Sequence, residues 1–233
     1  MHYYTTPGYT WDAMLKYTKM TLQLHDDIDM VLFIEKGIRG GISQCSNRYA
    51  KANNKYMKPE NIRSKEDIHY MMYYDINSLY GWGMSHSLPY GHFEWVKEED
   101  LNTTDYNVGD DFPVSYILEV DLEYPKEQHD QHKDLPFCPK RAKPPGCRQK
   151  KLLTTLHDKK NYVIHYKYLK YALDNGLKLK KIHRVLKFNQ LPWLKSYIEL
   201  NTRLRAKAKT EFEKNVYKLL NNAIYGIYYC NLN

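Results

Sequence analysis

Apolar and polar residues alternate most regularly between positions 114 and 124. A period of two residues is typical of a strand with one buried face. The apolar positions of this pattern are Val114, Tyr116, Leu118, Val120, Leu122 and Tyr124. Residues 177–188 alternate less regularly and predict another strand. Residues 68–77 are rich in Tyr and Met, and they predict a buried strand that ends on Asp75.

Apolar residues at helical spacing predict helices near both ends of the chain. One helix begins at the N-cap candidate Thr10, and another covers residues 165–175 and stops at Gly176. Residues 193–210 and 211–225 predict two successive helices. Because the strands come before the helical pair, the order of elements favours an α+β fold over a doubly wound parallel sheet.

Composition narrows the class of protein. The chain has 233 residues, of which 42% are hydrophobic and 27% charged, a balance typical of a globular domain with a sizeable core. The longest aliphatic and aromatic run covers only residues 30–34, which is too short for a transmembrane helix. The N-terminus lacks signal-peptide features, and four cysteines at irregular spacing suggest reduced thiols. We therefore expect an intracellular protein, nuclear or cytoplasmic, that is neither secreted nor embedded in a membrane.

The net charge of +8 favours a polyanionic partner, although an acidic substrate or a solubility bias would give the same value. The charge is unevenly distributed along the sequence. Residues 94–134 contain thirteen Asp and Glu against three Lys, and residues 140–187 contain fifteen Lys and Arg against two Asp. The basic stretch is the candidate for a nucleic-acid surface.

Residues 73–81 form the first segment that could carry chemistry. Asp75 follows a predicted strand, and a Ser-Leu-Tyr sequence comes shortly after it. A carboxylate at a strand end suits Mg²⁺, and the amides beyond it can meet phosphate oxygens. The alternative interpretation is that Asp75 caps a helix.

The second such segment lies in the last predicted helix. At 3.6 residues per turn, Lys214, Lys218, Asn222 and Tyr225 share one helix face. Two ammonium groups, an amide and a phenol ring in a row can bind a triphosphate and stack on a base. The alternative is a solvated helix face that ends at the C-cap Gly226.

Taken together, the two segments resemble a known family. Residues 75–80, Asp-Ile-Asn-Ser-Leu-Tyr, resemble the Asp-x-x-Ser-Leu-Tyr motif A of family B DNA polymerases. Residues 218–226, Lys-x-x-x-Asn-Ala-x-Tyr-Gly, resemble their motif B. The sequences of these two segments are most similar to those of the protein-primed branch, which is found in viruses, linear plasmids and Polinton or Maverick transposons. Other segments similar to the transposon branch are residues 2–8, 11–14, 37–43 and 178–188.

This resemblance implies a function and a domain organisation. The family transfers a deoxynucleoside monophosphate from a dNTP to a primer 3′ hydroxyl, or to a hydroxyl of a terminal priming protein, as directed by a DNA template. Residues 1–60 would link an exonuclease domain to the palm. Residues 61–190 would form the palm, an antiparallel sheet with packed helices and a loop insertion. Residues 191–233 would be finger helices.

The resemblance also implies the roles of individual residues. Asp75 would be the catalytic carboxylate and one of two that hold the Mg²⁺ pair. Tyr80 would be the steric gate that blocks a ribose 2′ hydroxyl, and Tyr225 would lie near the nascent base pair. The other candidates for nucleotide binding are Ser78, Leu79, Lys214, Lys218 and Asn222.

Candidate DNA contacts lie in two further segments. Arg39, Gly40 and Gly41 correspond to the end of a Tyr-x-Gly-Gly element that contacts template, but Ile38 replaces its Tyr. The other candidates lie in a predicted loop that could face the DNA phosphates: Arg141, Lys143, Arg148, Lys150 and Lys151. The alternative interpretation is that this loop faces only solvent.

The sequence also departs from the family at one important point. The Asp-Thr-Asp of motif C, which supplies the second metal-binding carboxylate, does not occur in these 233 residues. We therefore expect little or no polymerase activity from this chain alone. A non-catalytic nucleic-acid-binding remnant of a polymerase is the competing hypothesis.

Overall fold

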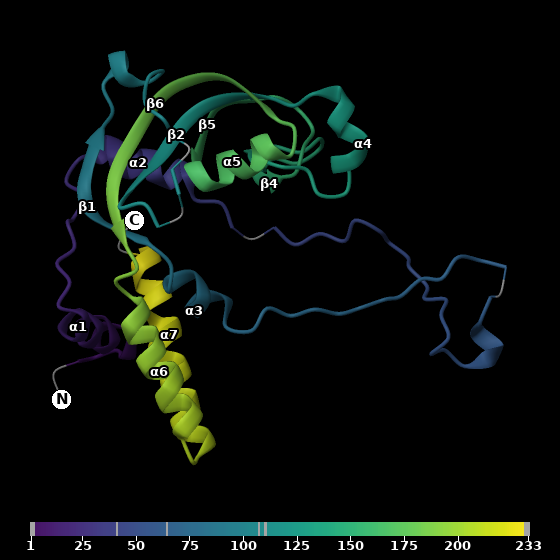
Figure 1. The fold of residues 1–233 in the computed structure, drawn as a ribbon, viewed down its shortest axis with the longest axis horizontal. Coiled ribbons are helices and arrows are strands. Elements are labelled where there is room, and N and C mark those ends of the chain that lie inside the picture. The colour runs from purple at the N-terminus through teal and green to yellow at the C-terminus, as the bar shows by residue number, and fades with distance from the viewer. Residues whose placement is uncertain (1–2, 41, 64, 107, 110, 231–233) are drawn as a thin grey trace.

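A computed structural model describes residues 3–40, 42–63, 65–106, 108, 109 and 111–230, with the burial of side chains described as far as Gly226. Figure 1 shows a curved sheet above a pair of long helices, and an extended arm that leaves both. The main sheet is antiparallel throughout, with the strand order β1-β6-β2-β5 in the described part of the chain. This arrangement confirms the predicted α+β class. The strands of this sheet are β1 (Leu88–Trp95), β2 (Val114–Glu123), β5 (Lys159–His165) and β6 (Lys178–Leu191).

Helices lie at both ends of the chain and around the sheet. A small second sheet pairs β3 (Lys140–Ala142) with β4 (Lys151–Leu153). The α-helices are α1 (Thr6–Thr18), α2 (Ile28–Gly37), α3 (Leu79–Met84), α4 (His129–His132), α5 (Tyr166–Asp174), α6 (Lys195–Lys207) and α7 (Glu211–Cys230). Short 3₁₀ turns are η1 (Pro59–Asn61), η2 (Glu98–Asp100) and η3 (Lys126–Gln128). The first helix starts earlier than predicted, because Thr5 rather than Thr10 accepts the capping hydrogen bond from Gly8.

The main core lies between the sheet and α5. Leu118 and Val120 of β2 are fully buried, as the alternating pattern predicted. Val185 of the neighbouring β6 joins them, and Ala172 of α5 is buried in the same cluster. The predicted strands at 114–124 and 177–188 and the predicted helix at 165–175 are therefore confirmed, each with bounds that differ by a few residues.

A second core joins helices from the two ends of the sequence. Met14 of α1, Leu194, Ile198 of α6 and Ile224 of α7 are almost completely buried against one another, and Met84 of α3 packs with them. Burial of this apolar surface is the main force that holds these helices together. The second core therefore fixes the short helix after Asp75 against the helix that carries Lys218.

The predicted strand at residues 68–77 is wrong. His69 forms an isolated bridge with Asn53, but no described residue pairs with the backbone of residues 70–76 in a sheet. The apolar side chains of the segment are accordingly exposed, and Tyr73 is 95% exposed. An apolar segment forms a strand of a sheet only where another strand is available to pair with its backbone N–H and C=O groups.

The acidic and basic stretches of the sequence partly neutralise each other within the main sheet. On neighbouring strands, Arg184 Nε lies 2.6 Å from Glu119 Oε2, and Lys180 pairs with Glu123. Lys187 of β6 likewise lies 2.9 Å from a carboxylate oxygen of Glu94 on β1. The expectation that residues 140–187 form one nucleic-acid surface therefore holds less well for β6, where Lys180, Arg184 and Lys187 already have acidic partners.

No helix in the described residues is both long enough and apolar enough to cross a bilayer.

Candidate nucleotide site and nucleic-acid interface

Asp75 lies in the exposed stretch that leads into α3. Its carboxylate has no hydrogen bond or ion pair with any described residue. The N-cap of α3 is Ser78, whose backbone is left-handed with φ 55° and ψ 40°. The alternative interpretation of Asp75 as a helix cap is therefore wrong, and its oxygens remain free for another ligand.

The ring of Tyr80 stacks on the ring of Tyr225. Their centroids lie 4.3 Å apart and their planes differ by 26°. The two residues are far apart in the sequence, one in α3 and the other in α7, and the second core brings these helices together. The structure thus joins the two segments that the sequence singled out.

Gly81 leaves room for the side chain of Ser78 at the start of α3. A Cβ at this position would lie 2.8 Å from Ser78 Oγ and 3.6 Å from Ile198 Cγ2 of α6. Contacts below 3.0 Å force neighbouring atoms to move. A larger residue at position 81 would therefore displace the Ser78 side chain.

An apolar pocket of about 420 Å³ opens beside the two stacked rings. Tyr80, Trp82 and Tyr225 line it with their aromatic side chains, and Leu194 contributes an aliphatic wall. Ile38, which precedes the Arg-Gly-Gly sequence, also lines the pocket. The segments that contain Ile38, Tyr80 and Tyr225 therefore line one cavity, and the two stacked tyrosine rings form part of its wall.

The predicted face of α7 adjoins this cavity. Tyr225 is half-buried, whereas Lys218 and Asn222 are exposed and have no hydrogen-bond or ion-pair partner among the described residues. Lys214 lies 2.6 Å from Glu211 Oε1, and this contact lowers the pKa of the Glu211 carboxyl. Because α7 continues beyond Gly226, the interpretation of that glycine as a C-cap is wrong.

The other two nucleotide-binding candidates lie at the start of α3. Ser78 is its N-cap, and Leu79 lines the apolar pocket. Both residues are exposed. They therefore lie between Asp75 and Tyr80 on an accessible turn.

A buried pair of amides between α6 and α7 was missed by sequence reasoning. Asn201 Nδ2 donates a hydrogen bond of 2.9 Å to Asn221 Oδ1, and the two residues are 3% and 8% exposed. Since an unpaired amide at such a position is costly, this bond fixes the rotation of α7 against α6. A polar residue on the apolar face of each predicted helix was the available signal.

We expect Asn201→Leu to destabilise the protein by about 1–3 kcal/mol, because the amide of Asn221 then stays buried without its partner. Asn201→Leu combined with Asn221→Leu should recover much of this loss, since no amide is then left unpaired. Urea unfolding of the wild type, both single variants and the double variant measures the coupling. Additive losses in the double variant would contradict the argument.

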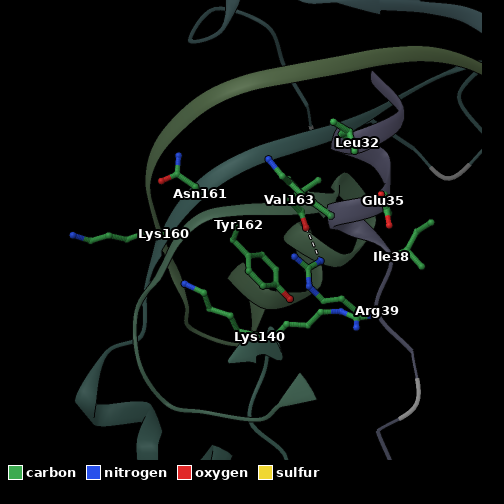
Figure 2. Close-up of a pocket in the computed structure, with 11 residues that line it drawn as sticks. Leu32, Glu35, Ile38, Arg39, Lys140, Lys160, Asn161, Tyr162 and Val163 are labelled. Atoms are coloured by element: carbon green, nitrogen blue, oxygen red, sulfur yellow. Dashed lines mark hydrogen bonds between the residues drawn. The ribbon is translucent and has the colours of Figure 1, made fainter. Parts of the chain in front are cut away.

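A second pocket, of about 660 Å³, lies between α2, β3 and β5 (Figure 2). It is lined by cationic side chains from segments far apart in the sequence, and Glu35 is the acidic residue of the lining. The cations are Lys36, Arg39, Lys140, Arg141 and Lys160. Two of the predicted DNA contacts, Arg39 and Arg141, are therefore brought together.

The guanidinium of Arg39 is already engaged by the protein (Figure 2). It donates hydrogen bonds of 2.6 Å to the carbonyl of Val163 and 3.1 Å to that of Gly37. It also lies 3.8 Å from the centre of the Tyr162 ring, and burial lowers the pKa of the guanidinium. Arg39 therefore ties the end of α2 to β5 and contributes positive charge to the pocket.

The remaining predicted DNA contacts among the described residues do not line the basic pocket. Gly40 is exposed with open space around its Cα, and Gly41 lies outside the described residues. The other cations are exposed along β4 and the preceding loop, outside the basic pocket, and have no acidic partner among the described residues: Lys143, Arg148, Lys150 and Lys151.

Asp75 fits a metal ion as a single ligand. An exposed, unpaired carboxylate is a hard oxygen donor of the kind that Mg²⁺ prefers. In the described part of the chain, no group of three or more His, Cys, Asp or Glu residues could hold a metal ion by itself. Other ligands, such as phosphate oxygens and water, would have to complete the coordination.

Comparison with known proteins places this geometry in context. Residues 9–233 match the family model described as DNA polymerase type B, organellar and viral. A search of curated proteins gives no match.

The solved structures that resemble the chain include several of Phi29 DNA polymerase. A ternary complex with primer-template DNA and incoming nucleotide matches with a TM-score of 0.59 and 18% identity, over 97% of this chain and 36% of that one. The orthorhombic crystal form matches with a TM-score of 0.60 at 18% identity, over the same shares of the two chains. The present chain thus spans little more than a third of the length of these polymerases, and at this identity the likeness concerns the fold.

Proposed function

Because this chain belongs to the organellar and viral family of type B DNA polymerases, we propose that it forms the nucleotide-binding part of a polymerase that synthesises DNA on a DNA template. The reaction is the transfer of a deoxynucleoside monophosphate from a dNTP to a hydroxyl acceptor. The partners are a DNA template, its primer and the incoming dNTP.

The stack of Tyr80 on Tyr225 beside the apolar pocket carries this proposal. A base and its sugar offer flat and apolar surfaces, which suit a pocket with aromatic walls. The cations of α7 lie along the same helix as Tyr225 and offer charge for a triphosphate. One site can therefore accept both ends of a nucleotide.

Each residue in the site has a proposed role. Asp75 holds a Mg²⁺ ion, which when bound stabilises negative charge on the triphosphate and at the attacking oxygen. The backbone amides up to Leu79 face the phosphates, and Ser78 shapes this turn through its left-handed backbone. Tyr80 blocks the 2′ hydroxyl of a ribonucleotide.

The side chains on α7 bind the rest of the nucleotide. Lys218 contacts the triphosphate as a point charge, and Asn222, one turn later, lies within reach of it. Tyr225 borders the nascent base pair. Lys214 supplements the charge, although Glu211 already pairs with it.

We propose further that the polymerase is protein-primed and closest to the Polinton or Maverick branch, so that a terminal protein supplies the first hydroxyl. The support is the resemblance of residues 75–80 and 218–226 to that branch. The proposed division is a linking region at 1–60, a palm at 61–190 and fingers at 191–233. The bridge between Asn53 and His69 spans the first of these boundaries.

The 233 residues alone are proposed to have little polymerase activity, because only one of the two required metal-binding carboxylates is recognised among them. Primer extension by the purified chain tests this point. Robust incorporation that Asp75→Ala abolishes would contradict it.

The second candidate function is nucleic-acid binding without catalysis. The basic pocket around Lys140 and Arg141 favours it, since neither Tyr80 nor Tyr225 lines this pocket. DNA binding that is unaffected by Asp75→Ala, Lys218→Ala, dNTP or Mg²⁺ would support this alternative.

We expect the chain to bind dATP in the presence of Mg²⁺, and Lys218→Ala to weaken this binding about tenfold, as the loss of one charge-assisted contact predicts. Isothermal titration calorimetry measures both affinities. Lys195→Ala is the matched control, because it removes an exposed lysine from the neighbouring helix. Equal effects of the two substitutions would argue against a triphosphate site on α7.

A further inference from the structure

Residues 48–63 and 65–70 form a small lobe at the end of the arm, remote from the sheet and the helices (Figure 1). We propose that this lobe is a binding surface for single-stranded DNA, separate from the nucleotide site and the basic pocket. The binding itself stands on the lobe's own residues. Only its use during DNA synthesis rests on the proposed function.

The lobe is held by the side chain of Asn53, which is 3% exposed. Its amide nitrogen donates to the carbonyls of Arg63, Glu66 and Asp67 at 2.9–3.1 Å, and its oxygen accepts from the backbone N–H of Arg63. Two backbone hydrogen bonds between Asn53 and His69 close the lobe at 2.9 and 2.8 Å. The lobe therefore has a defined shape, although none of its apolar side chains among the described residues is fully buried.

The tyrosines of the lobe lie at its surface. Tyr49, Tyr56 and Tyr70 are 79%, 78% and 51% exposed. The rings of Tyr56 and Tyr70 lie 6.4 Å apart, and Lys55 Nζ lies 5.2 Å from the centre of the Tyr56 ring. Exposed rings beside cations are the elements with which proteins stack single-stranded bases and bind their phosphates.

The charge of the lobe favours the same partner. The lobe contains six Lys and Arg residues and three acidic residues, Glu60, Glu66 and Asp67. Within the described residues, Arg63 is the one cation of the lobe with an acidic partner, Glu66. The cations are Arg48, Lys51, Lys55, Lys58, Arg63 and Lys65. A duplex or an acidic peptide would use this charge but would leave the aromatic faces unused.

The lobe is also close to Asp75 along the chain. Asp75 lies five positions after Tyr70, and an extended chain of that length reaches about 17 Å. A DNA strand that passes the nucleotide site can therefore reach the lobe within a few nucleotides.

The test uses fluorescence anisotropy of a labelled single-stranded oligodeoxynucleotide with the 233-residue chain. A variant with Lys51→Gln, Lys55→Gln and Lys58→Gln is expected to bind more weakly and to lower the slope of log affinity against log salt by about 2. The matched control carries Lys16→Gln, Lys178→Gln and Lys195→Gln, which remove equal charge from exposed positions elsewhere. An equal loss in both variants would overturn the proposal.

Stacking is tested separately. Tyr56→Ala is expected to weaken binding about tenfold, whereas Tyr56→Phe retains the affinity because the ring is kept. Amide exchange of Arg63 and His69 shows in each variant whether the lobe still folds. A loss that is the same for duplex DNA or polyglutamate as for the single strand would overturn the choice of partner.

The dNTP affinity of every variant is measured in parallel. We expect the lobe variants to keep it and Lys218→Ala to keep single-strand binding. Failure of the lobe proposal is therefore distinguishable from failure of the nucleotide site.

Discussion

Asp75→Asn is expected to remove the dependence of dNTP binding on Mg²⁺. In the wild type, Mg²⁺ should strengthen dATP binding, because the free carboxylate and the triphosphate oxygens share the ion. The amide keeps the shape of the side chain but not its charge. The affinity measured with Mg²⁺ should then fall by about 10- to 100-fold, a range comparable with other disrupted metal sites. Calorimetric titrations with Mg²⁺ and with EDTA measure the difference.

The matched control for this experiment is Asp174→Asn, which removes an exposed carboxylate from the end of α5. It should bind dATP as the wild type does in both conditions. If Asp75→Asn retained the full effect of Mg²⁺, Asp75 would not be a metal ligand and the proposed role of the segment would be wrong.

Tyr80→Val is expected to abolish discrimination between dATP and ATP. The Tyr80 ring is held by its stack on Tyr225, so it forms a firm wall where the sugar would lie. Apolar pockets reject an added hydroxyl by about a hundredfold at most. We expect the ratio of the two affinities to fall from that order towards unity.

Tyr80→Phe is the conservative control, because it retains the ring and its stacking partner. Tyr225→Ala should give an intermediate ratio, since the gate then loses its support. Competition titrations of dATP against ATP measure all four proteins. A ratio unchanged by Tyr80→Val would show that the ring does not face the sugar.

The elements that could be predicted from the sequence are those whose spacing of apolar residues shows which face is buried. The strand at 114–124 was recognisable because its alternation reflects one buried face, as the full burial of Leu118 and Val120 confirms. The helix at 211–225 was recognisable from its periodicity, although α7 extends beyond it.

The failures concern features that depend on other parts of the chain. Residues 68–77 have the composition of a strand, yet among the described residues they have no neighbouring strand to pair with. Strand β5 was missed because Lys159 and Lys160 interrupt its apolar pattern, although Lys159 is buried and donates to Thr155. Such compensation by a hydrogen bond cannot be read from a pattern of apolar residues.

The two segments of the candidate site could be predicted from the sequence, but the contact between them could not. The sequence selected Tyr80 and Tyr225 separately, and the second core brings their rings into contact. The engagement of Arg39 by Val163 was invisible, because that contact joins residues 124 positions apart.

The central claim is that residues 75–80 and 218–226 form one nucleotide site. Photo-crosslinking of the chain with 8-azido-dATP and Mg²⁺, followed by mass spectrometry of the labelled peptides, tests it most directly. We predict labels on the peptides that contain Tyr80 and Tyr225, both suppressed by excess dATP. Labels confined to the basic pocket around Lys140 and Arg141, or labels that excess dATP does not suppress, would contradict the account.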